Sequence, residues 1–283
     1  MPATDINKIY VIESLESCKS GTRIYEDALM YINHKHKNMD ADIHSIETLD
    51  EFNETLDEIL NDVINDKKSP FIHLEMHGND HGLKLTKESN IIEWKTLKEQ
   101  LTKINVATSN RLLLSLAACE GGYITKILNP LDRAPYFGMI GPFTKVKQGD
   151  LEQSYKAFFK EFSESFDGDS AMYALRKKST DESVYGFASC EAAFKLAYKL
   201  MEGLEKPSEE LNRHTVSLIA NFGISALEAK KQARQTMIQS DKRFFERSYE
   251  TFFMTDIDES NKERFKITYN DIRKNYISRL NKL

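Results

Sequence analysis

Two stretches decide the fold: Phe71-Ile72-His73-Leu74-Glu75-Met76, which stops at His77-Gly78, and Leu112-Leu113-Leu114-Ser115-Leu116-Ala117-Ala118, which stops at Cys119-Glu120-Gly121-Gly122. Short, largely apolar runs that end at glycine are typical of buried strands in a parallel sheet. Sites in open α/β sheets form where the strands end at their carboxyl edge. If the two strands are neighbours, a histidine and a cysteine therefore reach the same edge of the sheet.

Strands and helices alternate through the first 145 residues around these two stretches. The pattern predicts strands at 8–12, 42–46, 71–76, 111–118 and 136–140, helices at 22–36, 49–65 and 94–104, and a hairpin at 82–93. Such alternation implies right-handed crossovers and a mainly parallel sheet that is covered by helices on both faces. The predicted fold class is α/β, a three-layer sandwich.

The pattern becomes largely helical after residue 147. It predicts helices at 148–165, 169–178, 186–204, 208–223, 226–246 and 271–280, with short strands at 251–254 and 265–269. The polar stretch 179–183 is the expected boundary. We therefore expect a first domain at 1–180 and a mostly helical C-terminal extension at 181–283 that packs on the core.

Composition excludes several classes of protein. Hydrophobic residues make up 40% and charged residues 29% of the 283-residue chain, a balance typical of folded globular proteins. The net charge of −5 gives no basic excess, so direct binding of nucleic acid is not expected. No apolar run approaches the roughly 18 residues of a spanning helix, and the first residues do not resemble a signal peptide. We expect a cytoplasmic protein with no membrane partner.

Three cysteines, an odd number, do not indicate a disulfide framework. Cys18 and Cys190 are expected to be structural. Cys119 differs, because neighbouring strands lie about 4.8 Å apart and place its thiol within a few ångströms of His77. In such a dyad the thiolate is the nucleophile, and the histidine keeps it ionised and later protonates the leaving amine.

The residues next to the dyad suit the same chemistry. Gly78 has no side chain, so a substrate carbonyl can approach the backbone, and the amides of Gly78 and Cys119 are predicted to form an oxyanion hole. A helix expected at 120–128 would begin directly after Cys119, where a helix N-terminus lowers the pKa of a thiol.

These segments resemble the caspase-like cysteine peptidases, especially the bacterial branch called CHAT. The resemblance rests on His77-Gly78 after a strand, on Gly82-Leu83-Lys84-Leu85, and on Leu114-Ser115-Leu116-Ala117-Ala118-Cys119-Glu120-Gly121-Gly122, and it covers about residues 8 to 178. It implies a caspase-like sheet, a catalytic dyad of His77 and Cys119, and Gly78 as the oxyanion glycine. The chain departs from the family at Gly121, where threonine is usual, and at Phe143, where tryptophan is frequent.

A second resemblance follows the first strand. Lys19-Ser20-Gly21-Thr22 is similar to the caspase turn Arg-Ser-Gly-Thr, whose arginine binds the aspartate before the scissile bond. The resemblance implies that Lys19 selects an acidic substrate residue, although lysine lacks the bidentate fork of arginine.

Polar residues alternate along the strand that carries the histidine. His73 and Glu75 share a face with His77, and they are interpreted either as support for the site or as a purely structural network. His73, Glu75, His77, Asp80 and His81 are also metal-ligand types, but four residues of strand span about 13 Å, so only the last histidines and Asp80 could converge. We expect no metal and no cofactor.

The sequence therefore predicts a cysteine endopeptidase that acts on a partner protein. The resemblance implies a regulated bacterial protease of antiviral defence or cell death, kept dormant until an activating or sensor partner protein releases it. The alternative is a catalytically silent caspase-like module that serves as an interaction or adaptor protein. A metal-dependent hydrolase is a third possibility.

Overall fold

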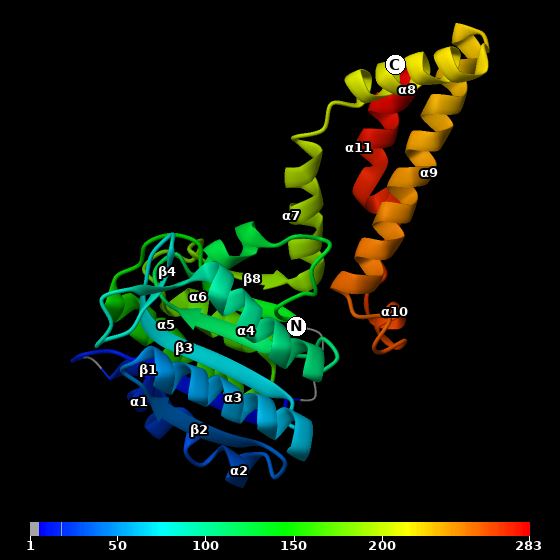
Figure 1. The fold of residues 1–283 in the computed structure, drawn as a ribbon. Coiled ribbons are helices and arrows are strands. Elements are labelled where there is room, and N and C mark those ends of the chain that lie inside the picture. The colour runs from blue at the N-terminus through cyan, green and yellow to red at the C-terminus, as the bar shows by residue number, and fades with distance from the viewer. Residues whose placement is uncertain (1–5, 18) are drawn as a thin grey trace. The chain divides into compact units, whose positions relative to one another are not determined.

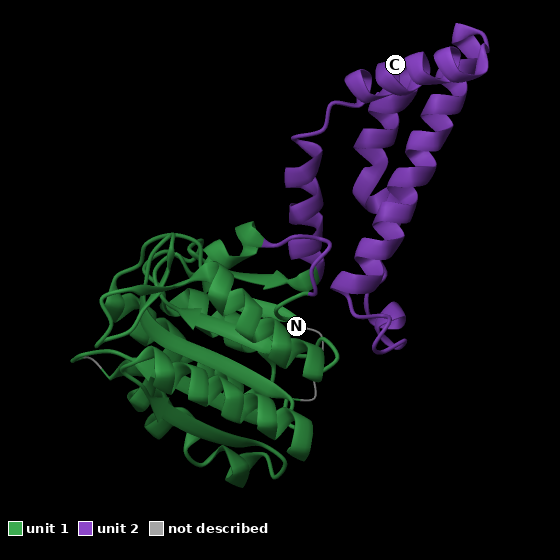
Figure 2. Cartoon of the chain, viewed as in Figure 1, with its two compact units in different colours: residues 1–127, 134–190 green, residues 128–133, 191–283 purple. Residues whose placement is uncertain are grey.

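The computed structural model describes residues 6–17 and 19–283 (Figure 1). The chain divides into two compact units (Figure 2): residues 1–127 with 134–190 form the first, and residues 128–133 with 191–283 form the second. Each helix in the described part is too short or too polar to cross a bilayer.

The first unit is built on one mixed sheet. Its main strands are β1 (Lys8–Ser14), β2 (Asp40–Ser45), β3 (Pro70–Gly78), β6 (Leu113–Ala117), β7 (Gly138–Pro142) and β8 (Tyr185–Ser189), in the order β2-β1-β3-β6-β7-β8. Neighbours pair in parallel except β7 and β8, which are antiparallel. The hairpin predicted at 82–93 is confirmed, since β4 (Gly82–Lys84) pairs with β3 and with β5 (Ile91–Glu93).

Helices cover both faces of this sheet (Figure 1). One layer contains α3 (Leu49–Asp66), α4 (Trp94–Ala107) and the 3₁₀ helix η2 (Gly121–Ile127). The other contains α1 (Ser20–Ile24), the π-helical turn η1 (Tyr25–Leu29), α2 (Ile32–Lys35), α5 (Gln148–Ser165) and α6 (Gly168–Lys178). The predicted three-layer α/β sandwich with a mainly parallel sheet is confirmed.

Aromatic side chains fix α5 against the strand that carries the histidine. The ring of Phe71 on β3 lies 5.6 to 6.0 Å from the rings of Phe158, Phe159 and Phe162, all of which are buried. Burial of rings of this size is a dominant favourable contribution to folding, at about 25 cal/mol per Å² of apolar surface. This packing fixes the start of β3, the strand that ends at His77-Gly78, against α5.

The second unit is helical, as predicted for the C-terminal region. It contains α7 (Cys190–Glu202), α8 (Pro207–Phe222), α9 (Ala226–Phe252), α10 (Asn261–Arg264) and α11 (Tyr269–Lys282). Leu211, Ala233, Met237, Tyr276 and Leu280 form a buried cluster between α8, α9 and α11. A second cluster consists of aromatic rings from α7 and the end of α9, among them Phe194, Phe245 and Phe252.

The unit boundary falls ten residues later than the predicted division into 1–180 and 181–283. The reason is β8, which occupies the start of the helix predicted at 186–204 and adds to the sheet of the first unit. Its Phe187 ring lies where a side chain at Gly138 would be, so the two strands approach closely. The predicted helix starts too early, because the helical spacing of apolar residues holds only from Cys190 onward.

Four other element predictions were wrong in type or extent. The segments 251–254 and 265–269 are not strands, because α9 continues to Phe252 and 265–268 is irregular; short aromatic runs suit either structure. The helix predicted at 22–36 is divided by the π-helical turn η1. The helix predicted at 120–128 is the short 3₁₀ helix η2.

Candidate active site

The register of β3 and β6 brings the predicted dyad to one edge of the sheet. Glu75 pairs with Ala117 at the end of the paired stretch, and His77 and Cys119 each follow two residues later, so both reach the same edge of the sheet. His77 is exposed and Cys119 is partly exposed. Directly after Cys119, Glu120 adopts a left-handed backbone conformation with φ of 59°, which turns the chain away from the strand direction.

Gly78 lies against the backbone of the cysteine. A Cβ atom at Gly78 would stand 2.8 Å from the carbonyl oxygen of Cys119 and 3.0 Å from the Cβ atom of Ala118. Such distances are shorter than real Cβ contacts, so only glycine fits here without a shift of the backbone. The close approach confirms that the ends of β3 and β6 stay adjacent, while the oxyanion role of Gly78 stays a prediction.

A cavity of about 150 Å³ opens beside the thiol. Its lining residues come from the ends of β1, β3 and β6 and from the chain around the start of α5: Leu15, Glu75, Met76, His77, Ala117, Cys119, Val146, Gln148 and Leu151. The structure thus brings three sequence-predicted residues, His77, Cys119 and Glu75, to one cavity. A thiol, an imidazole and a carboxylate around a space for a side chain suit acyl transfer.

The thiol of Cys119 is held by the segment that follows β7, residues 143–147, which we call the post-β7 segment. Cys119 Sγ donates a hydrogen bond of 3.2 Å to the carbonyl oxygen of Val146. The backbone amide of Glu120 donates a hydrogen bond to the carbonyl oxygen of Thr144. Within the part of the chain that the structure describes, no hydrogen bond joins Cys119 to His77. The hydrogen bond of the Cys119 sulfur is thus made with the post-β7 segment and not with the imidazole.

A hydrogen-bonded network lies beneath the dyad. Glu75, 2% exposed, accepts hydrogen bonds from Ser20 Oγ at 2.7 Å and from His73 Nε2 at 3.0 Å. The other ring nitrogen of His73 lies 2.7 Å from Ser115 Oγ. Every polar group of this set has a partner, as buried polar groups require. The predicted network exists; whether it supports catalysis stays a prediction.

Tyr155 of α5 closes the network from the helix layer. Its ring centroid is 5.0 Å from that of His73, and its hydroxyl donates to the carbonyl oxygen of Leu116, at 3.0 Å. Burial raises the pKa of Tyr155 well above its ordinary value, because the charged phenolate would lose its hydration. The hydroxyl therefore stays a donor, and it ties the end of β6 to α5.

Lys19 lies near the same edge of the sheet, but it already has an acidic neighbour. Its ammonium is 3.9 Å from a carboxylate oxygen of Glu13, which is fully buried at the end of β1. Glu13 also accepts hydrogen bonds from the Gly21 amide and from the Thr22 amide and hydroxyl. The Lys19-Ser20-Gly21-Thr22 turn thus wraps around two buried carboxylates, Glu13 and, through Ser20, Glu75.

Sequence reasoning missed Glu13 and Val146. An acidic residue in an otherwise apolar strand, Lys8-Ile9-Tyr10-Val11-Ile12-Glu13, was the available signal for Glu13. Val146 contributes a backbone carbonyl, which leaves no signature in the sequence. Cys18 lies outside the described residues, and Cys190 is 1% exposed, as expected for a core side chain.

The residues considered for metal binding do not gather. His73 and Glu75 are buried and bonded to each other, whereas His81 and Asp80 form an exposed ion pair at 3.6 Å. The described part of the chain holds no group of three or more histidine, cysteine, aspartate or glutamate side chains placed to bind a metal.

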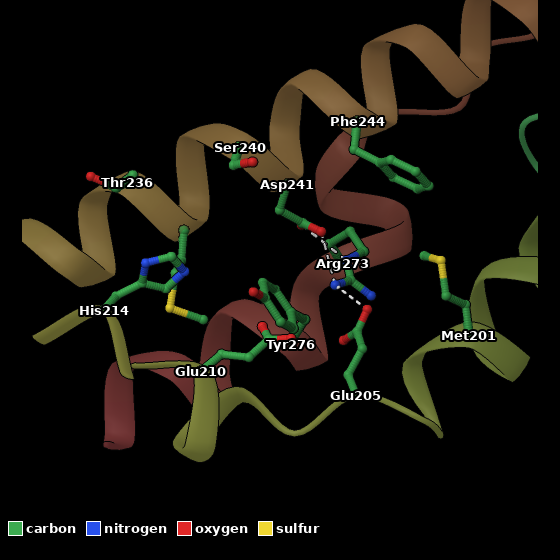
Figure 3. Close-up of a pocket in the computed structure, with 11 residues that line it drawn as sticks. Met201, Glu205, Glu210, His214, Thr236, Ser240, Asp241, Phe244, Arg273 and Tyr276 are labelled. Atoms are coloured by element: carbon green, nitrogen blue, oxygen red, sulfur yellow. Dashed lines mark hydrogen bonds and ion pairs between the residues drawn. The ribbon is translucent and has the colours of Figure 1, made fainter. Parts of the chain in front are cut away.

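A larger cavity of about 350 Å³ lies in the helical unit (Figure 3). Its base is Arg273, which is 1% exposed and donates to the carboxylates of Asp241 and Glu205. Burial raises the pKa of Glu205, an effect that Arg273 opposes. Because the guanidinium is enclosed and contacts two carboxylates, we interpret this group as a structural ion-pair cluster.

The comparisons with known proteins add no relative. No protein-family model matches the chain. No curated protein matches it significantly either. A functional assignment therefore depends on the fold and on the geometry of the cavity beside Cys119.

Proposed function

We propose that this protein is a cysteine endopeptidase of caspase-like type in which Cys119 is the nucleophile and His77 the general acid–base. The observation that carries the proposal is the shared cavity: both side chains come from the ends of adjacent parallel strands and line the same 150 Å³ space. Gly78 packs against the Cys119 backbone, and this contact keeps the ends of the two strands together.

The proposed reaction uses only these residues and water. The Cys119 thiolate attacks the scissile carbonyl carbon, a C–S bond forms, and the amides of Gly78 and Cys119 stabilise the oxyanion. The C–N bond then breaks, and the His77 imidazolium gives its proton to the leaving amine. Water, deprotonated by His77, hydrolyses the thioester and returns the thiol. The partner is a protein substrate, and the step needs no cofactor.

The hydrogen bond from Cys119 to Val146 favours a regulated enzyme. A thiol that donates to a carbonyl must lose that partner before it can transfer its proton to His77. Movement of the post-β7 segment would release it, and an activating partner protein is the agent that we propose. The resemblance to peptidases of bacterial antiviral defence suits such a dormant form, and so does a cytoplasmic location.

The same hydrogen bond also favours the second candidate, a caspase-like adaptor module that no longer cleaves. The reactivity of the thiols separates the two candidates. In an enzyme, Cys119 should react with iodoacetamide at neutral pH faster in wild type than in His77→Ala, since proximity to an imidazole favours the thiolate. In a silent module the two rates should be equal. Cys190 is buried, so its slow reaction is expected in both cases.

The decisive test compares wild type with Cys119→Ala and His77→Ala in the presence of candidate substrate proteins from neighbouring genes. Both variants should abolish cleavage while leaving the circular dichroism spectrum and the melting temperature close to those of wild type, since both side chains are at least partly exposed. Full cleavage by the Cys119→Ala variant would contradict the proposal.

A further inference from the structure

The cavity beside Cys119 has one acidic wall. Glu75 lines it, whereas most other lining side chains are apolar, among them Leu15, Ala117 and Leu151. At about 150 Å³ the cavity has the size that holds a molecule such as benzene, and it therefore suits a single side chain. An apolar channel with a carboxylate fits an aliphatic stem that carries a positive charge.

The carboxyl group of Glu75 is held in place by two neighbouring side chains. Its two oxygens accept from Ser20 Oγ and from His73 Nε2. With a proton on Nε2, His73 donates to Glu75 and accepts from Ser115 Oγ, so that one tautomer satisfies the whole set. His73 is itself fully buried against the rings of Tyr155 and Phe159, which fixes the position of the Glu75 carboxyl group beside the cavity.

The nearby lysine contacts a different carboxyl group. The Lys19 ammonium lies 3.9 Å from Glu13, and the Lys19 side chain is 45% exposed. Neither Lys19 nor Glu13 lines the cavity, whereas Glu75 does. A substrate side chain that enters the cavity therefore meets the carboxyl group of Glu75 among largely apolar neighbours.

We propose that the cavity binds the basic side chain, lysine or arginine, of the substrate residue whose carbonyl Cys119 attacks, and that Glu75 determines this specificity. The proposal rests on the proposed peptidase function and names its substrate class. This specificity is the reverse of the expectation that Lys19 selects an acidic substrate residue. The ammonium of Lys19 already has the carboxyl group of Glu13 as a neighbour, 3.9 Å away. Glu75 would pair directly with the substrate cation, in a buried place where a charge-assisted bond is strong.

Peptidyl chloromethyl ketones test this specificity on the full chain. Three reagents that differ only in the residue next to the reactive ketone, namely lysine, its neutral isostere norleucine, and aspartate, are compared by the rate of Cys119 alkylation in intact-mass measurements. Each rate is divided by the rate with iodoacetamide, which removes differences in thiol reactivity. The lysine reagent should react at least about tenfold faster than the norleucine reagent, and the aspartate reagent slowest, a difference of about 1.4 kcal/mol.

Two variants assign the preference to a residue. Glu75→Gln keeps the size of the side chain but removes its charge, and it should lower the lysine rate to that of norleucine. Lys19→Gln should keep the preference for lysine. A preference for aspartate that disappears in Lys19→Gln would overturn the proposal in favour of Lys19. The wild-type ratio of lysine to norleucine decides the matter even where Glu75→Gln fails to fold.

The outcomes also separate this inference from the proposed function. Equal rates with lysine and norleucine in wild type would overturn the basic specificity and leave the peptidase intact. Alkylation of Cys119 by iodoacetamide but by none of the peptidyl reagents, both in wild type and in Phe143→Ala, which is designed to release the post-β7 segment, would contradict the peptidase itself, and the specificity with it.

Discussion

Gly78 shows how one missing side chain shapes the candidate site. The ends of β3 and β6 approach so closely that a Cβ atom at this position would overlap the backbone of Cys119. Steric constraints alone therefore require glycine at this position, whether or not the site is catalytic. It also means that the distance between imidazole and thiol depends on the absence of a single methyl group.

Gly78→Ala should destabilise the first unit by about 1–3 kcal/mol, because the added methyl must displace the Cys119 carbonyl oxygen, 2.8 Å from its place. Denaturant melts followed by circular dichroism measure the change. Gly149→Ala is the matched control. Nothing lies within 4 Å of its Cβ position near the start of α5, so the same substitution should stabilise the chain by up to about 1 kcal/mol.

At the residue scale, the sequence predicted which side chains meet but not how they are bonded. His77, Cys119 and Glu75 were predicted from strand ends and alternation, and they line one cavity. The hydrogen-bond partner of the thiol was not predictable, because it is the backbone carbonyl of Val146, and every residue type carries such a group. Glu13 was overlooked although a lone acidic residue in a buried strand has to find donors.

The post-β7 segment is the element that connects the sheet to the thiol of Cys119. It begins at Phe143, whose ring lies where Cβ atoms of Gly122 and Gly186 would be, and it contacts Cys119 through Val146. The ring is 43% exposed but seated between two glycines. Removal of the ring should loosen the segment without opening the core.

Phe143→Ala should raise the rate at which iodoacetamide alkylates Cys119 several-fold, since the Val146 carbonyl no longer stays on the thiol. The measurement is intact-mass labelling at neutral pH with the circular dichroism spectrum as a check of folding. Phe166→Ala, at the far end of α5 and 38% exposed, is the control and should leave the rate unchanged. An unchanged rate in Phe143→Ala would show that the segment does not restrain Cys119.

Helices and strands were predicted well where the spacing of apolar residues fitted only one of the two structures. The parallel strands and α3, which begins with a capping box at Thr48 and Glu51, follow the predicted ranges closely. β8 was missed because its five residues include glycine and serine and directly precede a strong helical pattern. Its pairing with β7 is a tertiary contact, which local propensity does not contain.

At the scale of the whole molecule, the two units have separate sources of stability. The first depends on the sheet and the phenylalanines of α5, and the second on the packing of α8, α9 and α11 and on the ion pairs of Arg273. Composition and patterning predicted one α/β part and one helical part. The position of the boundary depended on β8, and so it was misplaced by ten residues.

Arg273→Met should destabilise the helical unit by about 1–3 kcal/mol, because the partly buried carboxylates of Asp241 and Glu205 would lose the hydrogen bonds from its guanidinium. Hydrogen exchange should increase in α9 and α11 while β3 and β6 stay protected. Arg279→Met is the control. This arginine is 45% exposed and lies 3.6 Å from the carboxylates of Glu202 and Glu205, so its loss should change stability by less than about 1 kcal/mol. Equal effects of both substitutions would contradict the importance of the buried pair.

The seat of the Phe143 ring has a biological consequence if Cys119 is the nucleophile. The post-β7 segment is anchored by Phe143 at one end and contacts the Cys119 sulfur through Val146 near the other. Its release from the sulfur therefore needs only a local movement and no unfolding. Loop movements of this kind take nanoseconds to microseconds. A cell could then stockpile the folded enzyme harmlessly and arm it almost at once, without new synthesis or the cutting of a precursor.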